Sequence, residues 1–313
     1  MKLSTPVALK ALETKIDFQS QLLWLGSCFA ENMGNQFAQL GFSQLSNPFG
    51  ILFQPLALQR LVERALQANY FTQTDLVHHN GLWHCFELHS ICSNSDSEAM
   101  IKQLNAKLDQ FQNQLEKATH IGFTLGTAWV YRHIERDEVV ANCHKIPQNQ
   151  FTKELLSVGQ IETALQKLIE SIQAVNPNVQ VVFTVSPVRH SKDGLVENQR
   201  SKAQLLVALH QLLETHQAYY FPAYEILLDE LRDYRFYADD LLHPNPLAIR
   251  YIWDKWLSIS TTPETQALIA EVEAVQKSRQ HRPFNPDTAE HQVFLEKLDK
   301  KVEELRNKGV IIN

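Results

Sequence analysis

The chain has 313 residues, with 29 Lys and Arg against 35 Asp and Glu, which gives a net charge of −6 at pH 7. A nucleic-acid-binding protein normally carries an excess of basic residues, so this balance argues against that class. Hydrophobic residues make up 44% of the chain. That proportion can form a sizeable core, and it excludes disordered, collagen-like and disulfide-scaffold proteins.

The N-terminal residues lack the apolar stretch of a secretory signal, and no segment approaches the ~18 consecutive apolar residues of a membrane span. The four cysteines form no C-x-x-C pair, so a structural zinc site has no support and we expect reduced thiols. No phosphate-binding glycine motif is present either. The sequence therefore predicts a cytoplasmic protein with no metal or cofactor and with no membrane or nucleic-acid partner.

Short apolar runs alternate with helical patterns from the start of the chain. Residues 22–25 form an apolar run that ends at Gly26, which is typical of a buried strand, and residues 30–40 predict the helix that follows. A turn is expected at 47–50, and a second helix from 55 to about 68. Residues 70–97 show no regular pattern.

The alternation becomes clearer after residue 100. Helices are predicted around 101–115, 161–175 and 203–213, strands at 121–125 and 179–185, an extended segment at 219–221, and a last core helix after Pro246. Strands that read as continuous apolar runs between helices predict an α/β fold, with a mostly parallel sheet covered on both faces.

Residues 262–313 differ in composition, because nine acidic and eight basic residues fall within this short stretch. Apolar residues at helical spacing predict helices around 268–275 and 295–305, and a proline-containing break at 282–286 separates them. We therefore divide the chain into a domain at 1–261 and a charged helical hairpin at 262–313. The hairpin would dock on the core or on a partner chain, and it could join two copies in a homo-oligomer. A solvated extension without a specific role is the alternative.

Gly26-Ser27-Cys28 follows the first predicted strand and opens a helix. Ligands of open parallel sheets bind at the carboxyl ends of the strands, and a helix N-terminus stabilises negative charge there. This position suits a nucleophilic serine, although serine is also a favoured helix cap. Cys28 is an alternative nucleophile, since a helix N-terminus lowers the pKa of a thiol. Neighbouring side chains at such a turn point apart, so only one of Ser27 and Cys28 can face a base.

A serine nucleophile needs a base, and His243 is the best candidate. Asp240 lies three residues before it, so a single turn can bring the carboxylate to the imidazole. An acidic partner on one ring nitrogen fixes the tautomer and leaves the other nitrogen free to accept a proton. The alternative interpretation is an ordinary capped turn with a surface histidine.

A serine after the first strand, with D-x-x-H before the last core helix, resembles the SGNH/GDSL hydrolase superfamily. The residues Gly26 to Ala30 read GSCFA and resemble the motif of the GSCFA family within it. Four further segments resemble that family in the same order: Asn47-Pro48-Phe49-Gly50, Asn142-Cys143-His144-Lys145, Ser186-Pro187-Val188-Arg189 and His243-Pro244. The resemblance covers residues from about 20 to 258.

This resemblance implies a three-layer α/β/α flavodoxin-like fold in which Ser27 is the nucleophile, His243 the base and Asp240 its orienting acid. It also implies an oxyanion hole made by the N–H groups of Ser27 and Gly50 and an asparagine side chain. The block that would supply the asparagine reads Gly126-Thr127-Ala128-Trp129 instead. Asn142 is therefore our substitute candidate, with Thr127 behind it, although Asn142 could equally be a turn residue.

We expect a serine esterase-type hydrolase acting on an acyl ester of a carbohydrate or a small molecule. An acyltransferase would use the same residues, and a non-catalytic binding protein that keeps the fold is the other alternative. His89, Thr127 and Arg189 are expected to contact the substrate; Arg189 would hold an anionic group, or else belong to a solvated loop. The histidines near His89 lack the spacing of a zinc site.

Overall fold

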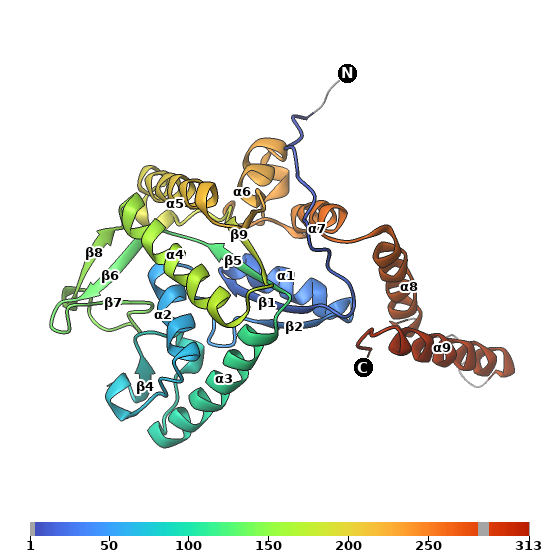
Figure 1. The fold of residues 1–313 in the computed structure, drawn as a ribbon, viewed down its shortest axis with the longest axis horizontal. Coiled ribbons are helices and arrows are strands. Elements are labelled where there is room, and N and C mark those ends of the chain that lie inside the picture. The colour runs from blue at the N-terminus through green and yellow to red at the C-terminus, as the bar shows by residue number, and fades with distance from the viewer. Residues whose placement is uncertain (1–3, 281–287, 313) are drawn as a thin grey trace.

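The computed structural model describes residues 4–280 and 288–312. Its centre is a five-stranded sheet in which all strands are parallel and lie in the order β2–β1–β5–β9–β10 (Figure 1). Relative to the chain, this is the 2-1-3-4-5 order of flavodoxin-like sheets. The predicted α/β fold with a mostly parallel sheet is therefore confirmed. The strands are β1 (Gln21–Gly26), β2 (Ser43–Ser46), β5 (His120–Leu125), β9 (Gln180–Val185) and β10 (Tyr219–Tyr220).

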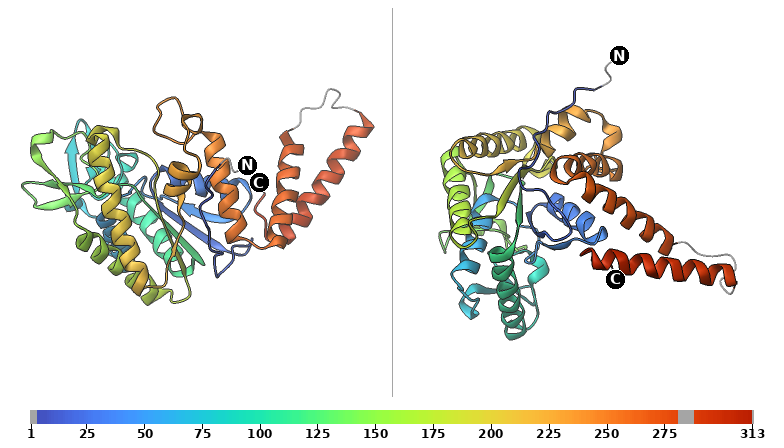
Figure 2. Two further views of the ribbon diagram at one scale, coloured as in Figure 1. Left: turned by 90° about the horizontal axis from the view of Figure 1, so that it is seen from above. Right: turned by 45° about the vertical axis from the view of Figure 1, so that its right-hand side comes forward.

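Helices cover both faces of this sheet (Figure 2). Successive side chains of a strand point to opposite faces, so β1 contributes to two separate apolar clusters. Leu23 and Leu25 belong to the larger cluster, and Leu22 and Trp24 belong to the other. The larger cluster contains side chains of α2 (Pro55–Leu66), α3 (Ser97–Lys117), α4 (Val158–Val175) and α5 (Leu195–Thr215), and the other contains those of α1 (Cys28–Gln39) and α7 (Pro246–Ser260).

Two small antiparallel units are inserted between the elements of the main fold, and the sequence analysis predicts neither. One is the hairpin of β3 (Leu76–His79) and β4 (Leu82–Cys85), and the other is the sheet of β6 (Trp129–His133), β7 (Glu138–Val140) and β8 (Phe151–Leu155). The edge strand β2 is also missing from the prediction, and the predicted helix at 203–213 begins earlier, at Leu195.

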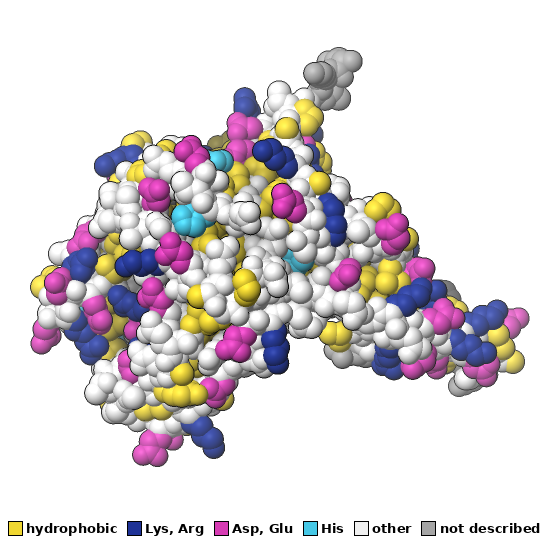
Figure 3. All heavy atoms as spheres, in the orientation of Figure 1, with side chains coloured by type: hydrophobic (Ala, Val, Ile, Leu, Met, Phe, Trp, Pro, Cys, Tyr) yellow, Lys and Arg dark blue, Asp and Glu magenta, His cyan; other side chains and the backbone are white. Residues whose placement is uncertain are grey.

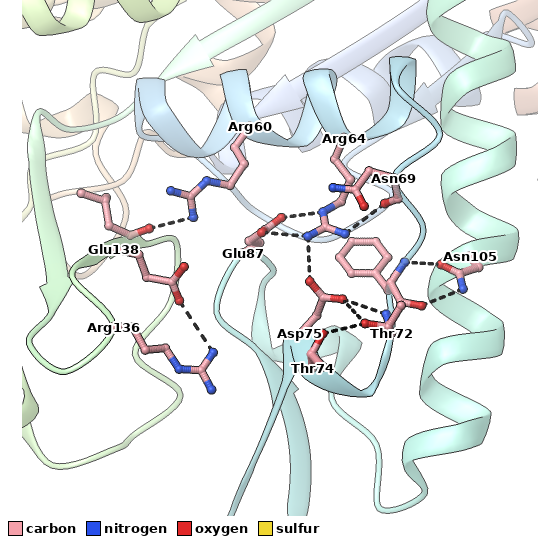
Figure 4. A network of polar contacts seen from close by, with 12 residues as sticks. Arg60, Arg64, Asn69, Thr72, Thr74, Asp75, Glu87, Asn105, Arg136 and Glu138 are labelled. Carbon is pink, nitrogen blue, oxygen red and sulfur yellow. Dashed lines mark hydrogen bonds and ion pairs between the residues drawn. The ribbon is translucent and has the colours of Figure 1, made fainter.

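Arg64 of α2 joins the β3–β4 hairpin region to the main fold (Figure 4). Its guanidinium donates hydrogen bonds to both carboxylate oxygens of Glu87 at 2.8 and 3.0 Å, to Asp75 at 2.8 Å and to the carbonyl of Asn69 at 3.0 Å. The ring of Phe71 lies 4.3 Å from the guanidinium. The Arg64 side chain is only 8% exposed. Its hydrogen bonds hold the insert that carries His89 close to the sheet.

We expect Arg64→Met to lower the free energy of unfolding by roughly 3–5 kcal/mol, because it leaves two half-buried carboxylates without their cation. Arg132→Met is the matched control. Arg132 pairs with Glu154 at 2.9 Å on the surface, and loss of such a pair costs about 1 kcal/mol or less. Urea unfolding of both variants tests this, and equal losses in the two would contradict the role given to Arg64.

The C-terminal region forms α8 (Pro263–Gln280) and α9 (Ala289–Asn307), which confirms the two predicted helices. The predicted break at 282–286 lies outside the described residues. At the base of the pair, Val272 and Leu305 are fully buried in the cluster that contains α1 and α7, and the N–H of Ile311 donates to the carbonyl of Gly41 at 2.7 Å. The rest of the pair projects from the core (Figure 2). The division into domains at 261/262 and the homo-oligomer stay predictions.

Basic and acidic side chains are interspersed on the face of the molecule seen in Figure 3, over both the core and the projecting helices. None of the described helices combines the length and the apolar character that crossing a membrane requires.

Candidate active site

Ser27 directly follows β1 and is the N-cap of α1, where its Oγ accepts a hydrogen bond from the N–H of Phe29 at 3.3 Å. β1 lies between β2 and β5, so Ser27 sits at the point where the strand order reverses, which is where ligands bind in sheets of this kind. The turn depends on Gly26, whose φ is +128° and whose Cα faces the carbonyl of Thr124 so closely that a Cβ would lie 2.2 Å from it. Ser27 is 5% exposed.

Asn47 braces this turn, and the sequence analysis gives it no role of its own. Its Oδ1 accepts from the N–H of Gly26 at 2.9 Å, and its Nδ2 donates to the carbonyl of Gly26 at 3.2 Å. Gly50 closes a second turn, which begins at Asn47. Its φ is +80°, and a Cβ there would lie 2.5 Å from the Cβ of His89. Through Asn47, the structure thus connects the Ser27 turn with Gly50 and His89.

The two N–H groups predicted for the oxyanion hole already have acceptors in this structure. The N–H of Ser27 donates to the carbonyl of Thr124 at 3.1 Å, and the N–H of Gly50 donates to the carbonyl of Asn47 at 2.8 Å. An oxyanion would therefore have to share these donors or displace their present acceptors.

Asp240 and His243 form the pair that D-x-x-H predicts. Asp240 Oδ2 lies 2.6 Å from His243 Nδ1, and Asp240 Oδ1 accepts from the N–H groups of Leu242 and His243, each at 2.9 Å. These backbone hydrogen bonds, together with the imidazole, lower the pKa of Asp240 to about 2. The carboxylate is therefore ionised at neutral pH. Both side chains are about half exposed, and no hydrogen bond joins His243 to Ser27.

His190 lies near His243, in the loop that follows β9. Its ring packs 5.3 Å from the ring of Phe53, and its backbone N–H donates to Asn198 Oδ1 at 2.9 Å. Burial lowers the pKa of His190 to about 4, and the nearby charges of Lys202 and His243 add to that shift. His190 is therefore neutral at pH 7.

Lys202 of α5 is the functional candidate that the sequence analysis misses. Its side chain is fully buried, and its Nζ donates to the carbonyl of Gly126 at 2.6 Å and to that of Ser186 at 2.7 Å. These carbonyls directly follow β5 and β9. Through these two hydrogen bonds the lysine joins the ends of two strands beside the serine turn. Burial lowers the pKa of Lys202 to about 7.

Three further residues from the sequence analysis lie near the carboxyl ends of the sheet strands. Thr127 follows β5, and its Oγ1 lies 2.9 Å from Ser201 Oγ of α5, so it helps to anchor the loop. Arg189 lies in the same loop as His190 and donates to Gln199 Oε1 at 2.7 Å. Cys28 is half-buried, and burial raises the pKa of its thiol, with Glu31 acting in the same direction.

Asn142 lies in the turn between β7 and β8, where its Oδ1 accepts from the N–H of His144 at 2.8 Å. His144 in turn has both ring nitrogens in hydrogen bonds, with Ser90 Oγ at 3.1 Å and with the carbonyl of Cys85 at 2.7 Å. Because a carbonyl can only accept, Nε2 carries the proton and Nδ1 accepts from Ser90. Asn142 therefore has a place in a turn, and its role in oxyanion binding stays a prediction.

We expect His144 to make the protein less stable in acid. Burial lowers the pKa of His144 from its ordinary value of 6.5 to about 4. Between these pH values the unfolded chain binds a proton that the folded chain does not, so stability falls as pH falls, by roughly 3 kcal/mol at pH 4. His144→Gln should flatten the dependence of the unfolding free energy on pH between 7 and 4, whereas His291→Gln, at a partly exposed position on α9, should not. Identical slopes in wild type and His144→Gln would contradict this.

The residues that the structure describes contain no group of three or more His, Cys, Asp or Glu side chains arranged to hold a metal ion. His84, one of the histidines near His89, uses its ring nitrogens in hydrogen bonds with Ser93 Oγ at 2.6 Å and the carbonyl of His79 at 3.1 Å.

Comparison with known proteins identifies the family. The model of the GSCFA family matches residues 21–256, and that of the GSCFA domain protein, C-terminal domain, matches residues 272–310. The chain therefore belongs to the GSCFA family, which confirms the family predicted from the motifs. The C-terminal helices, which those motifs leave unassigned, have a family model of their own.

Two further comparisons concern individual proteins. No curated protein matches the sequence. Among solved structures, the chain is similar to a carbohydrate esterase family 3 protein from Talaromyces cellulolyticus, with 9% sequence identity and a TM-score of 0.38. The alignment covers 82% of this chain and 99% of that one.

Proposed function

We propose that this protein is a serine hydrolase of the SGNH/GDSL type that cleaves an acyl ester of a carbohydrate or small molecule. The observation that carries the proposal is the Asp240–His243 pair, with its 2.6 Å contact to Nδ1. An ionised carboxylate on Nδ1 keeps the proton there and leaves Nε2 as an acceptor, which is what a general base needs. Ser27, at the reversal point of the strand order, is the hydroxyl that such a base would serve.

In the proposed reaction, Ser27 Oγ attacks the ester carbonyl while His243 Nε2 takes its proton. The bond to the alcohol then breaks, and His243 returns the proton to the leaving oxygen. Water attacks the acyl group on Ser27 through the same base and restores the serine. His243 lies on an exposed loop, and hydrogen bonds of this kind often form only when substrate is bound.

Two features favour Ser27 over its neighbour as the nucleophile. The pKa of the Cys28 thiol is raised by burial, so the thiolate that attacks an ester is disfavoured. Ser27 instead caps α1 directly, where the helix dipole stabilises a negative charge on the reacting group.

For the oxyanion we propose the N–H groups of Ser27 and Gly50, with Asn142 as the third donor. The first two also donate to backbone carbonyls, so the oxyanion would share them. Since loss of one oxyanion donor typically lowers the rate ~10²–10³-fold, we expect slow turnover unless these carbonyls move aside. The same occupied donors are the observation that favours the alternative, a non-catalytic binding protein.

Labelling with a fluorophosphonate probe tests the proposal. We expect a single adduct on Ser27 by intact mass and peptide mapping. It should be lost in His243→Ala and retained in His291→Ala, which removes a partly exposed histidine of α9. Absence of an adduct, while a known serine esterase labels in parallel, would favour the binding protein. An adduct on Cys28 with a thiol-directed probe would show that the neighbouring residue is the reactive one.

A further inference from the structure

A cavity of about 550 Å³ adjoins the Asp240–His243 pair, and its volume is within the range of small-molecule sites. Leu241 and Leu242, the two residues between Asp240 and His243, form part of its wall. The other walls come from the loop after β9, the start of α5, and residues 228–237 after the short helix α6 (Ala223–Glu225). The cavity therefore shares the loop that carries the proposed base.

The wall of the cavity is largely apolar, yet several of its apolar side chains face solvent. Leu195 is 64% exposed, Leu241 is 55% exposed and Tyr234 is 73% exposed. Large apolar side chains gathered around one concave surface mark a site for apolar groups of a ligand. This cavity thus favours a ligand part that is mainly hydrocarbon.

Charge gives the cavity a second preference. Of its charged lining residues, Arg232 is paired with Asp229 at 2.9 Å, and Asp233 is paired with Arg235 at 3.1 Å. Arg189 is different, because its hydrogen bond goes to the neutral amide of Gln199, and no carboxylate in the described chain pairs with it. The cavity therefore holds one positive charge that the protein leaves uncompensated.

A tyrosine and a glutamine position the guanidinium of Arg189. The ring of Tyr224 lies 5.9 Å from the guanidinium of Arg189. The Tyr224 hydroxyl donates at 3.1 Å to Gln199 Oε1, the oxygen that also accepts from Arg189. Arg189 is thus held in place by neutral groups, and its guanidinium keeps donors for the bidentate binding of a carboxylate.

We propose that this cavity binds the acyl part of the substrate, and that this part is an aliphatic chain ending in a carboxylate, which pairs with Arg189. The proposal rests on the proposed esterase function and narrows its substrate class to esters of dicarboxylic acids with one free carboxylate.

Kinetics with matched esters test it. Nitrophenyl hexanoate and the nitrophenyl monoester of adipic acid have acyl chains of equal length, and only the latter carries the free carboxylate. We expect wild type to prefer the adipate ester in kcat/KM, and Arg189→Met to reduce that ratio by about 10- to 100-fold. Arg200→Met, which removes an exposed arginine of α5 outside the cavity, should keep the wild-type ratio. No preference in wild type, or an unchanged ratio in Arg189→Met, would overturn the proposal.

A binding measurement separates this proposal from the esterase function itself. The monoamide of adipic acid, which keeps one free carboxylate, should raise the thermal unfolding midpoint of wild type more than hexanamide, which has none, and Arg189→Met should remove the difference. This result without any fluorophosphonate adduct would support the cavity and contradict the esterase. An adduct on Ser27 without a difference between the adipic monoamide and hexanamide would leave the esterase standing and reject the cavity as a carboxylate site.

Discussion

Ser27→Ala is expected to lower kcat/KM by at least ~10³-fold for every ester that the wild type cleaves, because removal of a serine nucleophile leaves only binding and oxyanion stabilisation. The substitution also removes the cap of α1, at a cost of about 1 kcal/mol, which the fold should tolerate. Initial rates with a series of nitrophenyl esters measure the effect, and circular dichroism checks that the variant is folded.

Cys28→Ala is the matched control for this prediction. It changes the adjacent side chain at the same strand-to-helix turn, and we expect it to keep most of the wild-type activity because the thiol is held protonated. Activity that survives in Ser27→Ala but is lost in Cys28→Ala would show that the nucleophile is the cysteine.

Lys202→Met should have the largest effect on stability of any single change near the site. The methionine fills similar space but leaves the carbonyls of Gly126 and Ser186 without their buried donor. Each unsatisfied buried group costs about 1–3 kcal/mol, so we expect a loss of roughly 2–6 kcal/mol together with weaker fluorophosphonate labelling, since both loops border the site.

The pH dependence gives a second readout for Lys202. Its pKa is lowered from 10.5 to about 7, so between these values the unfolded chain holds a proton that the folded chain lacks. Stability contributed by this residue therefore rises with pH across that window. The rise should be absent in Lys202→Met and present in Lys167→Met, an exposed lysine of α4. Equal stability of the two variants would contradict the role of Lys202.

The main sheet was predictable because its buried strands are continuous apolar runs. β1, β5 and β9 stand out in this way, whereas β2 reads Ser-Gln-Leu-Ser at the edge of the sheet and is only half-buried. The β3–β4 hairpin could have been found, since Asn80 and Gly81, with φ of 49° and 76°, form the turn that Asn-Gly predicts. The β6–β8 sheet gives no comparable signal.

The contact between Asp240 and His243 was predictable because the two residues are close in the sequence. Asp240 and His243 are three residues apart, so their contact depends on one turn. Lys202 became visible only with the structure, because a lysine in a helix is normally solvated. The sequence does hold one signal: Lys202 continues the helical spacing of Leu205, Leu209 and Leu212, which puts a lysine where an apolar residue belongs.

The segment before β1 is tied to the end of α7. The N–H groups of Leu12 and Ile16 donate to the carbonyls of Ile259 and Ser260 at 3.0 and 2.7 Å, and Lys15 donates to Ile259 across a separation of 244 residues. Contacts between such distant parts of a chain form slowly, because the intervening loop must close first. The β1–α1–β2 unit can therefore assemble early in folding, before the hydrogen bonds between residues 12–16 and the end of α7 have formed. We expect the C-terminal helices to dock late as well, because the hydrogen bond from Ile311 to Gly41 also joins distant parts of the chain.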